Sequence, residues 1–437
     1  MDILIMVGQL ILGLSILVGL HEFGHLITAK MFGMKVEQYS IGFPPKIWGF
    51  TWRGTEYLLG AIPLGGYVKI AGMIDESMDK TFLNQEPQPW EFRSKPAWQR
   101  LIVMMGGILV NVITGIIIFI LLIFNTGEEY IPAKAVKHGI VAHPLAQEIG
   151  LKTGDKIVKI NGQSFDRFED VVSAKILLNS NSYYTIERDG QQMDIRIPND
   201  LIEKLSDKKN TNKRFIDPIL PFEVGEVSPN SPAQKAGMLK GDKIVGINEK
   251  PIAFFHELQE ALQQNKSKDI DLKVSRKGEV VSLKAKVTEE GKLGFLPRYD
   301  FKFESLHYSF GQSVSKGTTM AFTVVYDNIK GFGKIFRGEV SASKSLSGPI
   351  GIAQVFGSTW DWQRFWRITA VLSMVLAFMN FLPIPALDGG HVMFLTYEIV
   401  SGRKPSDSFL EASQKVGMVL LLGLMAFAIF NDIYKLF

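Results

Sequence analysis

Two histidines and a glutamate near the N-terminus have the types and the spacing needed to bind a metal ion and to move a proton. His21 and His25 are four residues apart, so on an α-helix they project from one face, roughly 6 Å apart along its axis. Both imidazoles can therefore reach one zinc ion. Glu22 points about 100° further round the helix, where it can take a proton from the water that a metal activates.

The setting of this motif favours metal binding over a chance match. Residues 3–20, which precede it, contain one strongly polar side chain, Gln9. A chance match is expected on an exposed helix, whereas three ionisable groups at the end of an apolar span are costly unless paired or ligated. The chain has no cysteine, which excludes thiolate ligands, disulfides and thiol nucleophiles. Any metal must then be held by histidine and carboxylate.

The composition is that of a membrane protein. Of 437 residues, 46% are hydrophobic, and the net charge of +4 is too small to indicate a nucleic-acid partner. Four apolar segments predict four transmembrane helices. They run from Ile3 through the histidine motif, from Leu101 to Phe124, from about Ile368 to Leu387 and from about Val416 to Ile433.

The distribution of lysine and arginine predicts the orientation of these helices. Basic residues are frequent between the first two apolar segments and occur between the last two, so both stretches are expected on the cytoplasmic side. The N-terminus and residues 125–367 are then expected outside, although Arg364 and Arg367 disagree mildly. The first segment lacks the basic start of a cleavable signal peptide.

Residues 35–70 have the pattern of β-strands. Residues 36–41 roughly alternate, and the strands expected at 47–52 and 56–62 flank a turn at 53–55. A glycine-rich strand, 63–70, follows. This region is either a small cytoplasmic sheet or an edge strand beside the metal that pairs with an extended substrate backbone. Residues 84–100 mix prolines, aromatics and basic residues, which is typical of an interfacial anchor; a gate is the alternative.

An ungapped repeat lies within residues 125–300. Residues 146–161 (Ala-Gln-x-x-Gly-x-x-x-Gly-Asp-Lys-Ile-Val-x-Ile-Asn) recur as residues 233–248. Each copy predicts a short helix, a glycine turn and a buried strand, and it resembles the core of a bacterial PDZ domain. The resemblance implies two PDZ-like α+β modules, with the charged residues 202–214 as their linker.

Asp388 is the expected third metal ligand. It stands at the end of the third apolar segment, in Leu387-Asp388-Gly389-Gly390-His391. Both His21 and Asp388 come roughly 27–30 Å along spans that run inward, so they reach a similar depth. An aspartate that caps a helix before the glycines is the alternative, and His391 is a competing ligand beyond the glycine turn.

Several motifs together resemble the site-2 protease family, in its bacterial regulator-of-sigma-E branch. They are the His-Glu-x-x-His span, Pro63-Leu-Gly-Gly-Tyr-Val-Lys69, the paired modules, Ser347-Gly-Pro-Ile-Gly-Ile-Ala353 and Asn380-x-x-Pro-x-Pro-x-Leu-Asp-Gly389. The resemblance implies an intramembrane zinc endopeptidase of the bacterial inner membrane, with its metal site toward the cytoplasm. Implied substrates are single-pass membrane proteins already cut by another protease, such as anti-sigma factors, and remnant signal peptides.

The resemblance also implies substrate contacts. Asn380 is expected to contact the substrate, and residues 63–70 are expected to form a membrane re-entrant β-loop that offers Gly65, Gly66, Tyr67 and Val68 to it. Two other functions compete. A membrane-anchored PDZ scaffold needs no His, Glu and Asp at matched depth, and a zinc transporter explains neither the two modules nor a general base beside the ligands.

The predicted fold is thus a polytopic α-helical membrane protein with a membrane-associated β-hairpin and two extracytoplasmic PDZ-like domains. Its expected segments are 1–34 (first span), 35–100 (hairpin and interfacial segment), 101–124 (second span), 125–201 (first module), 202–214 (linker), 215–300 (second module), 301–367 (extracytoplasmic connection), 368–390 (third span), 391–415 (cytoplasmic loop) and 416–437 (fourth span).

Overall fold

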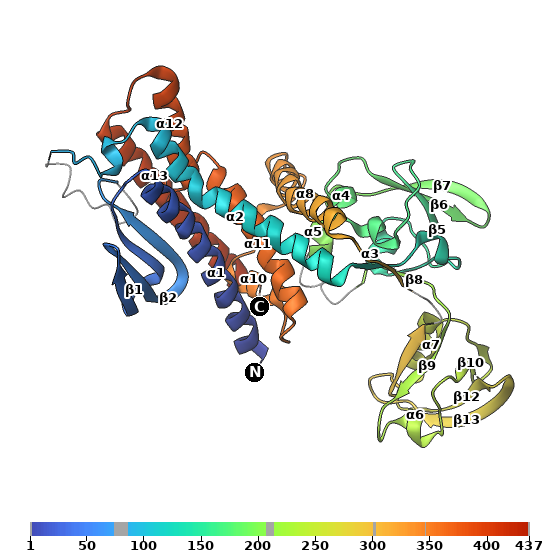
Figure 1. The fold of residues 1–437 in the computed structure, drawn as a ribbon. Coiled ribbons are helices and arrows are strands. Elements are labelled where there is room, and N and C mark those ends of the chain that lie inside the picture. Colours follow the sequence, from blue (N-terminus) through green and yellow to red (C-terminus); the bar gives the residue numbers. More distant parts are fainter. Residues whose placement is uncertain (1, 74–85, 207–213, 300–302, 346, 436–437) are drawn as a thin grey trace. The chain divides into compact units, whose positions relative to one another are not determined.

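The chain forms two compact units in the computed structural model, which describes residues 2–73, 86–206, 214–299, 303–345 and 347–435 (Figure 1). The first unit joins Met1–Gly127 to His307–Phe437 and is mainly helical. The second unit, Glu128–Leu306, is built from short strands and short helices. Hydrophobic clusters lie inside each unit, so each has its own core.

The helices of the first unit include the expected long apolar ones. They are α1 (Asp2–Met31), η1 (Phe92–Ser94), α2 (Ala97–Thr126), α8 (Phe310–Phe336), α9 (Ala342–Ser345), α10 (Pro349–Phe356), α11 (Trp362–Phe381), α12 (Asp388–Ser401) and α13 (Asp407–Tyr434). Among the described residues, three helices are long and apolar enough to cross a membrane: α1, α2 and most of α13. They correspond to the first, second and fourth predicted spans.

The third predicted span differs from the structure. The helix expected over 368–390 is divided into α11 and α12 by an irregular loop at 382–387. Pro383 and Pro385 explain the break, because proline lacks the N–H that continues a helix and biases the preceding residue toward extended backbone. The expected loop 391–415 is also largely helical: it contains most of α12 and the start of α13.

Helix α2 is central to the first unit and packs against α1, α8, α11 and α12 (Figure 1). Its contact with α1 is made by main chains. A Cβ atom on Gly24 would lie 2.3 Å from the carbonyl oxygen of Gly106, and one on Gly106 would lie 2.5 Å from that of Gly24. Small residues at a helix crossing allow this close approach, which is a common way to pack apolar helices in lipid.

The segment predicted as an extracytoplasmic connection, 301–367, holds a long helix that sequence reasoning missed. Helix α8 packs against α2 and α11, and Ala321 lies in a hydrophobic cluster with Phe119 and Met374. A Cβ atom on Gly317 would lie 2.6 Å from the main-chain nitrogen of Ile120, so this contact is also close. The segment is therefore part of the helical unit.

Strands β1 (Val36–Trp52) and β2 (Thr55–Ile70) form the predicted hairpin, with positive φ angles at Arg53 and Gly54 in its turn. Both strands are long and bend, so the sheet has four rows. Residues 38–41 pair with 66–69 on one side and with 56–59 on the other, and 56–59 also pair with 48–51. Within the described chain, residues 66–69 pair only with 38–41, so they form an edge of the sheet.

Two predicted segments lie only partly within the described residues. Residues 84 and 85 of the expected interfacial segment lie outside the described residues, and the remainder contains η1 and the first turn of α2. The expected linker 202–214 begins inside helix α5 (Leu201–Ser206), and its residues 207–213 also lie outside the described residues.

The second unit contains two modules with separate hydrophobic clusters. Its elements are β3 (Glu128–Tyr130), η2 (Ala133–Ala135), β4 (Ile140–Ala142), α3 (Pro144–Glu148), β5 (Lys156–Ile160), η3 (Phe168–Val172), α4 (Ala174–Leu177), β6 (Tyr183–Arg188), β7 (Gln191–Arg196), α5, β8 (Ile216–Pro218), β9 (Phe222–Val227), α6 (Pro232–Lys235), β10 (Lys243–Ile247), β11 (Lys250–Pro251), α7 (Phe255–Gln264), β12 (Asp269–Arg276), β13 (Glu279–Lys286), β14 (Phe295–Tyr299) and β15 (Glu304–Leu306). Strand β8 pairs with β4, and Phe215 and Ile216 lie in the first cluster. The first module therefore extends beyond the predicted boundary at 201, because strand β8, which follows the predicted linker, pairs with β4 of that module.

Both copies of the repeat fold alike. In each copy the strand ends at an asparagine with a positive φ angle, 51° at Asn161 and 52° at Asn248. The side-chain oxygen of Asn161 accepts a hydrogen bond from the main-chain N–H of Tyr183, and that of Asn248 accepts one from Asp271. The repeated asparagine is explained by this turn, because asparagine tolerates the left-handed region and bonds nearby backbone.

Candidate metal centre

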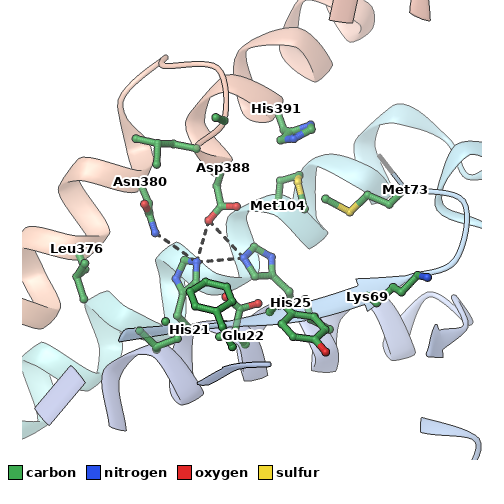
Figure 2. Close-up of a pocket in the computed structure, with 18 of the residues that line it drawn as sticks. His21, Glu22, His25, Lys69, Met73, Met104, Leu376, Asn380, Asp388 and His391 are labelled. Carbon is green, nitrogen blue, oxygen red and sulfur yellow. Dashed lines mark hydrogen bonds and ion pairs between the residues drawn. The ribbon is translucent and has the colours of Figure 1, made fainter. Parts of the chain in front are cut away.

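The three predicted ligands come together from two distant parts of the chain (Figure 2). His21 and His25 lie one turn apart on α1, and Asp388 is the first residue of α12. The Nε2 atoms of the two histidines are 3.3 Å apart. The Oδ2 atom of Asp388 lies 3.1 Å from Nε2 of His21 and 3.3 Å from Nε2 of His25. This group can hold a metal ion.

The spacing of these three atoms fits a tetrahedral zinc site. Ligand atoms at about 2.0–2.1 Å from zinc in a tetrahedron are about 3.3 Å from one another. The observed separations of 3.1 to 3.3 Å match that edge. The Oδ2 atom of Asp388 is also buried without a hydrogen-bond donor. Two histidines, one carboxylate and an open fourth side form the donor set of catalytic zinc sites.

The loop before α12 sets the position of Asp388. Leu387 is the N-cap residue of α12 and makes no side-chain cap, so the expected alternative of a capping aspartate has no support here. Gly389 follows because the loop folds back on the helix: a Cβ atom there would lie 2.1 Å from the carbonyl oxygen of Leu382. The Asp-Gly pair therefore combines a ligand with the only residue type that fits beneath the loop.

Glu22 lies beside the ligand group and faces the same cavity. It is half-buried on α1 and lines a cavity of about 600 Å³ together with His21, His25 and Asp388. The main chain of Val68 is within hydrogen-bonding reach of its carboxylate. A carboxylate in this place can accept a proton from a water molecule held near the ligands.

The edge of the sheet lines the same cavity. Gly65, Gly66, Tyr67 and Val68, the residues predicted to bind substrate, all line it. The sheet is fixed to α1 at this level, because the Tyr39 hydroxyl donates a hydrogen bond of 2.7 Å to the carbonyl oxygen of Gly19. The structure thus places an edge strand against the wall of the cavity that contains the candidate ligands.

The remaining candidates take different places. Asn380, at the end of α11, has its Nδ2 atom 3.3 Å from Nε2 of His21 and lines the cavity. His391 also lines the cavity, but it lies about one turn along α12 from Asp388 and outside the group of convergent ligands (Figure 2). The competing assignment of His391 as the third ligand is therefore not supported.

Sequence reasoning missed the contribution of α2 to this centre. Asn111 and Met104 line the cavity, and Nδ1 of His25 donates a 2.8 Å hydrogen bond to the carbonyl oxygen of Val103. Asn111 was visible as a polar residue inside an apolar segment, which is the signal that could have identified it. A main-chain acceptor such as Val103 leaves no trace in residue type.

Comparison with known proteins gives one family. The model of Peptidase family M50 matches residues 9–424. The chain is 31% identical to the regulator of sigma E protease of Haemophilus influenzae over 466 residues, which cover all of both chains. It is 28% identical to the regulator of sigma-E protease RseP of Escherichia coli K12 over 451 residues, or 98% of both chains. It is also 30% identical, over 98% of both chains, to a Vibrio cholerae protein described as a zinc metalloprotease.

Proposed function

Because this chain belongs to peptidase family M50, we propose that it is an intramembrane zinc metalloprotease that cleaves the spanning segments of single-pass membrane proteins. The observation that carries this proposal is the convergence of His21, His25 and Asp388, with separations of 3.1 to 3.3 Å, beside Glu22. The relatives described as zinc metalloprotease and as regulator of sigma E protease support the same conclusion.

Each residue of the centre has a role in this proposal. His21, His25 and Asp388 hold the zinc ion, which when bound supplies Lewis acidity and lowers the pKa of a coordinated water to about 7. Glu22 accepts the proton of the attacking water and returns it to the leaving amine. Asn380, with its amide at the mouth of the group, donates a hydrogen bond to the substrate backbone.

The edge strand prepares the substrate for cleavage. A helical segment hides its carbonyls in its own hydrogen bonds, so a spanning segment must unwind before a peptide bond can be attacked. Residues 66–68 belong to the edge row of the sheet and line the wall of the cavity, where an extended segment can add as a further strand. Substrates with small or helix-breaking residues in their spans are therefore the preferred ones.

The orientation follows from the charge distribution. Helices α1, α2, α11 with its following loop, and α13 are the four spans, the hairpin and α12 lie toward the cytoplasm, and Glu128–Leu306 lies outside. The cell membrane of a bacterium is the expected location, with lipids as neighbours and no nucleic-acid partner. Natural substrates in this proposal are anti-sigma-type proteins trimmed by another protease, and remnant signal peptides.

The first test is the substitution Glu22→Gln in the purified full-length chain. The amide cannot accept the proton, so cleavage of a model spanning segment should fall by about 10²–10⁴-fold. Zinc content and substrate binding should remain, because the three ligands are untouched. Cleavage near the wild-type rate would remove Glu22 as the base. A wild-type protein that carries zinc but cleaves nothing would favour the scaffold or the transporter.

The two repeated modules, which we propose to be PDZ-like, select substrates by size. They occupy the connection between α2 and α8, so a substrate with a large folded outer domain would collide with them, while a trimmed one would not. The alternative is that they dock specific C-termini.

Deletion of residues 128–300 separates these two roles. If the modules exclude by size, untrimmed substrates should now be cleaved, and trimmed ones should be cleaved at a similar rate. If cleavage of trimmed substrates stops in a deletion protein that still binds zinc, the modules recruit substrates instead.

A further inference from the structure

The ring nitrogens that do not face the ligand group both face α2. Each imidazole has two nitrogens, and a metal-bound histidine must carry its proton on the nitrogen away from the metal. For His25 this is settled by Val103, since a carbonyl oxygen 2.8 Å from Nδ1 can only accept. In the neutral ring that binds a metal, Nε2 of His25 is therefore left with a free lone pair toward the ligand group.

The corresponding nitrogen of His21 faces Asn111. The Nδ2 atom of Asn111 lies 3.3 Å from Nδ1 of His21, and its Oδ1 atom is buried without a hydrogen-bond partner. If His21 binds a metal through Nε2, its Nδ1 carries a proton, and two donors then face each other. A 180° rotation of the amide exchanges oxygen and nitrogen with almost no change of shape. It brings the unsatisfied oxygen to the imidazole N–H.

We infer that Asn111 is the positioning residue of His21: its Oδ1 accepts a hydrogen bond from Nδ1–H and so presents Nε2 to the metal. This inference rests on the proposed function, because it requires that the centre binds zinc. Hydrogen-bond partners of this kind fix the tautomer and the orientation of a ligating ring. A residue that is only 1% exposed and polar, in the middle of an apolar helix, needs such a partner.

Helix α2 is built to serve both histidines from one face. Val103, Gly107 and Asn111 are spaced by four residues and so lie along one side of the helix. The glycine between the two acceptors makes room for the rings: a Cβ atom there would lie 2.5 Å from Nε2 of His25 and 2.6 Å from Cε1 of His21. Along this side of α2, Val103 faces the ring of His25, Asn111 faces the ring of His21, and Gly107 leaves space for both rings.

The main chain of Asn111 is held separately from its side chain. The hydroxyl of Ser373, on α11, donates a 2.7 Å hydrogen bond to the main-chain carbonyl oxygen of Asn111, and Ser373 is fully buried. Loss of this bond perturbs α2 at the same residue without removing the amide. Ser373→Ala is thus a matched control for a general disturbance of the helix.

The test is the zinc affinity of the full-length chain in detergent, measured by competition with a chelator. Asn111→Leu keeps the volume and removes the acceptor, so affinity should fall by about 10–100-fold, as for other partners of ligating histidines. Asn111→Asp restores an acceptor and should keep an affinity close to that of the wild type. Ser373→Ala should also stay close to it, because it leaves the side chain of Asn111 intact.

Three outcomes would overturn the inference: unchanged affinity in Asn111→Leu, an Asn111→Asp protein as weak as Asn111→Leu, or equal weakening in Ser373→Ala. The second would mean that Asn111 acts as a donor, and the third that it acts through packing. The proposed function fails separately, because it fails if the wild-type chain binds no zinc. The visible absorption of the cobalt-substituted protein gives a second readout, since a misoriented His21 should alter the tetrahedral spectrum in Asn111→Leu only.

Discussion

Asp155 and Asp242 of the second unit and Asp388 of the first unit each have buried carboxylate oxygens, but their surroundings differ. In the second unit, Asp155 and Asp242 are each 1% exposed and each accept two hydrogen bonds from one arginine, Arg188 and Arg276 respectively, at 2.7–2.8 Å. Each also accepts a main-chain N–H, and each arginine reaches a carbonyl oxygen at the glycine turn. Both carboxylates are therefore neutralised and hydrogen-bonded by groups of the chain itself.

Among the described residues, no arginine pairs with Asp388 in this way. Its Oδ2 atom is buried without a donor and faces the Nε2 atoms of His21 and His25. The Nδ1 atom of His25 is bonded to the carbonyl oxygen of Val103, so Nε2 is the ring nitrogen that faces Asp388. The comparison teaches that a carboxylate paired with arginine is neutralised within the fold, whereas one that faces two imidazole nitrogens is placed to share a metal ion with them.

The largest effect is expected from Asp388→Asn, which removes the charge that the cation balances. A neutral amide is a poor zinc ligand, so zinc affinity should fall beyond the ~10–100-fold typical of outer-sphere changes, and cleavage should fall with it. Metal analysis of the purified protein and turnover of a model spanning segment measure the two. An Asp388→Asn protein with full zinc and full turnover would show that Asp388 only shapes the start of α12.

A smaller and local effect is expected from Arg276→Met in the second module. The substitution removes the two hydrogen bonds and the charge that Arg276 gives to Asp242, so the stability of that module should fall. Hydrogen exchange of β10 and β12 in the full-length chain measures this cost. Arg188→Met is the matched change in the first module and should lower protection there instead, while zinc content stays unchanged in both. Loss of zinc in either variant would break the proposed separation between the two kinds of aspartate.

The smallest effect is expected from lowering the pH, which protonates Asp242 and weakens its ion pair with Arg276. Burial alone would raise the pKa of Asp242, but hydrogen bonds from Arg276 and from the main chain of Leu239 outweigh it and lower that pKa. The resulting stability is present above the unfolded pKa of about 3.9 and is lost as the pH falls through the lowered folded value. Hydrogen exchange of β12 should therefore weaken below about pH 4, and Arg276→Met should remove most of this dependence. If the pH dependence of protection in β12 is the same in Arg276→Met, groups other than Asp242 cause it.

The sequence predicted which residues converge at the candidate metal centre better than it predicted the helices that carry them. The spacing of His21 and His25 is local to one helix, and the depth argument for Asp388 needed only the length of two spans, so the convergence of these three residues could be predicted from sequence. The break at 382–387 was also encoded, in Pro383 and Pro385, but the apolar run outweighed it in the prediction.

Other features depend on contacts between distant residues and could not be predicted in the same way. Helix α8 carries too many polar residues to be recognised as part of the apolar unit, and only its packing on α2 places it there. The repeat identified Asp155 and Asp242 but not their arginines, which stand 33 and 34 residues further along and outside the matching stretch. A role for Asn111 could be inferred only once the structure showed its amide beside the ring of His21.

The glycine contact between α1 and α2 also limits the direction from which a substrate can arrive. A helix with its side chains is about 10 Å wide, yet at Gly24 and Gly106 the two main chains leave no room even for a methyl group. This seam lies one residue from His25 and from Gly107, so it closes one flank of the centre at the depth of the ligands. If the proposed function holds, a polypeptide would therefore approach the centre from another side of α1, such as the wall of the cavity lined by residues 66–68.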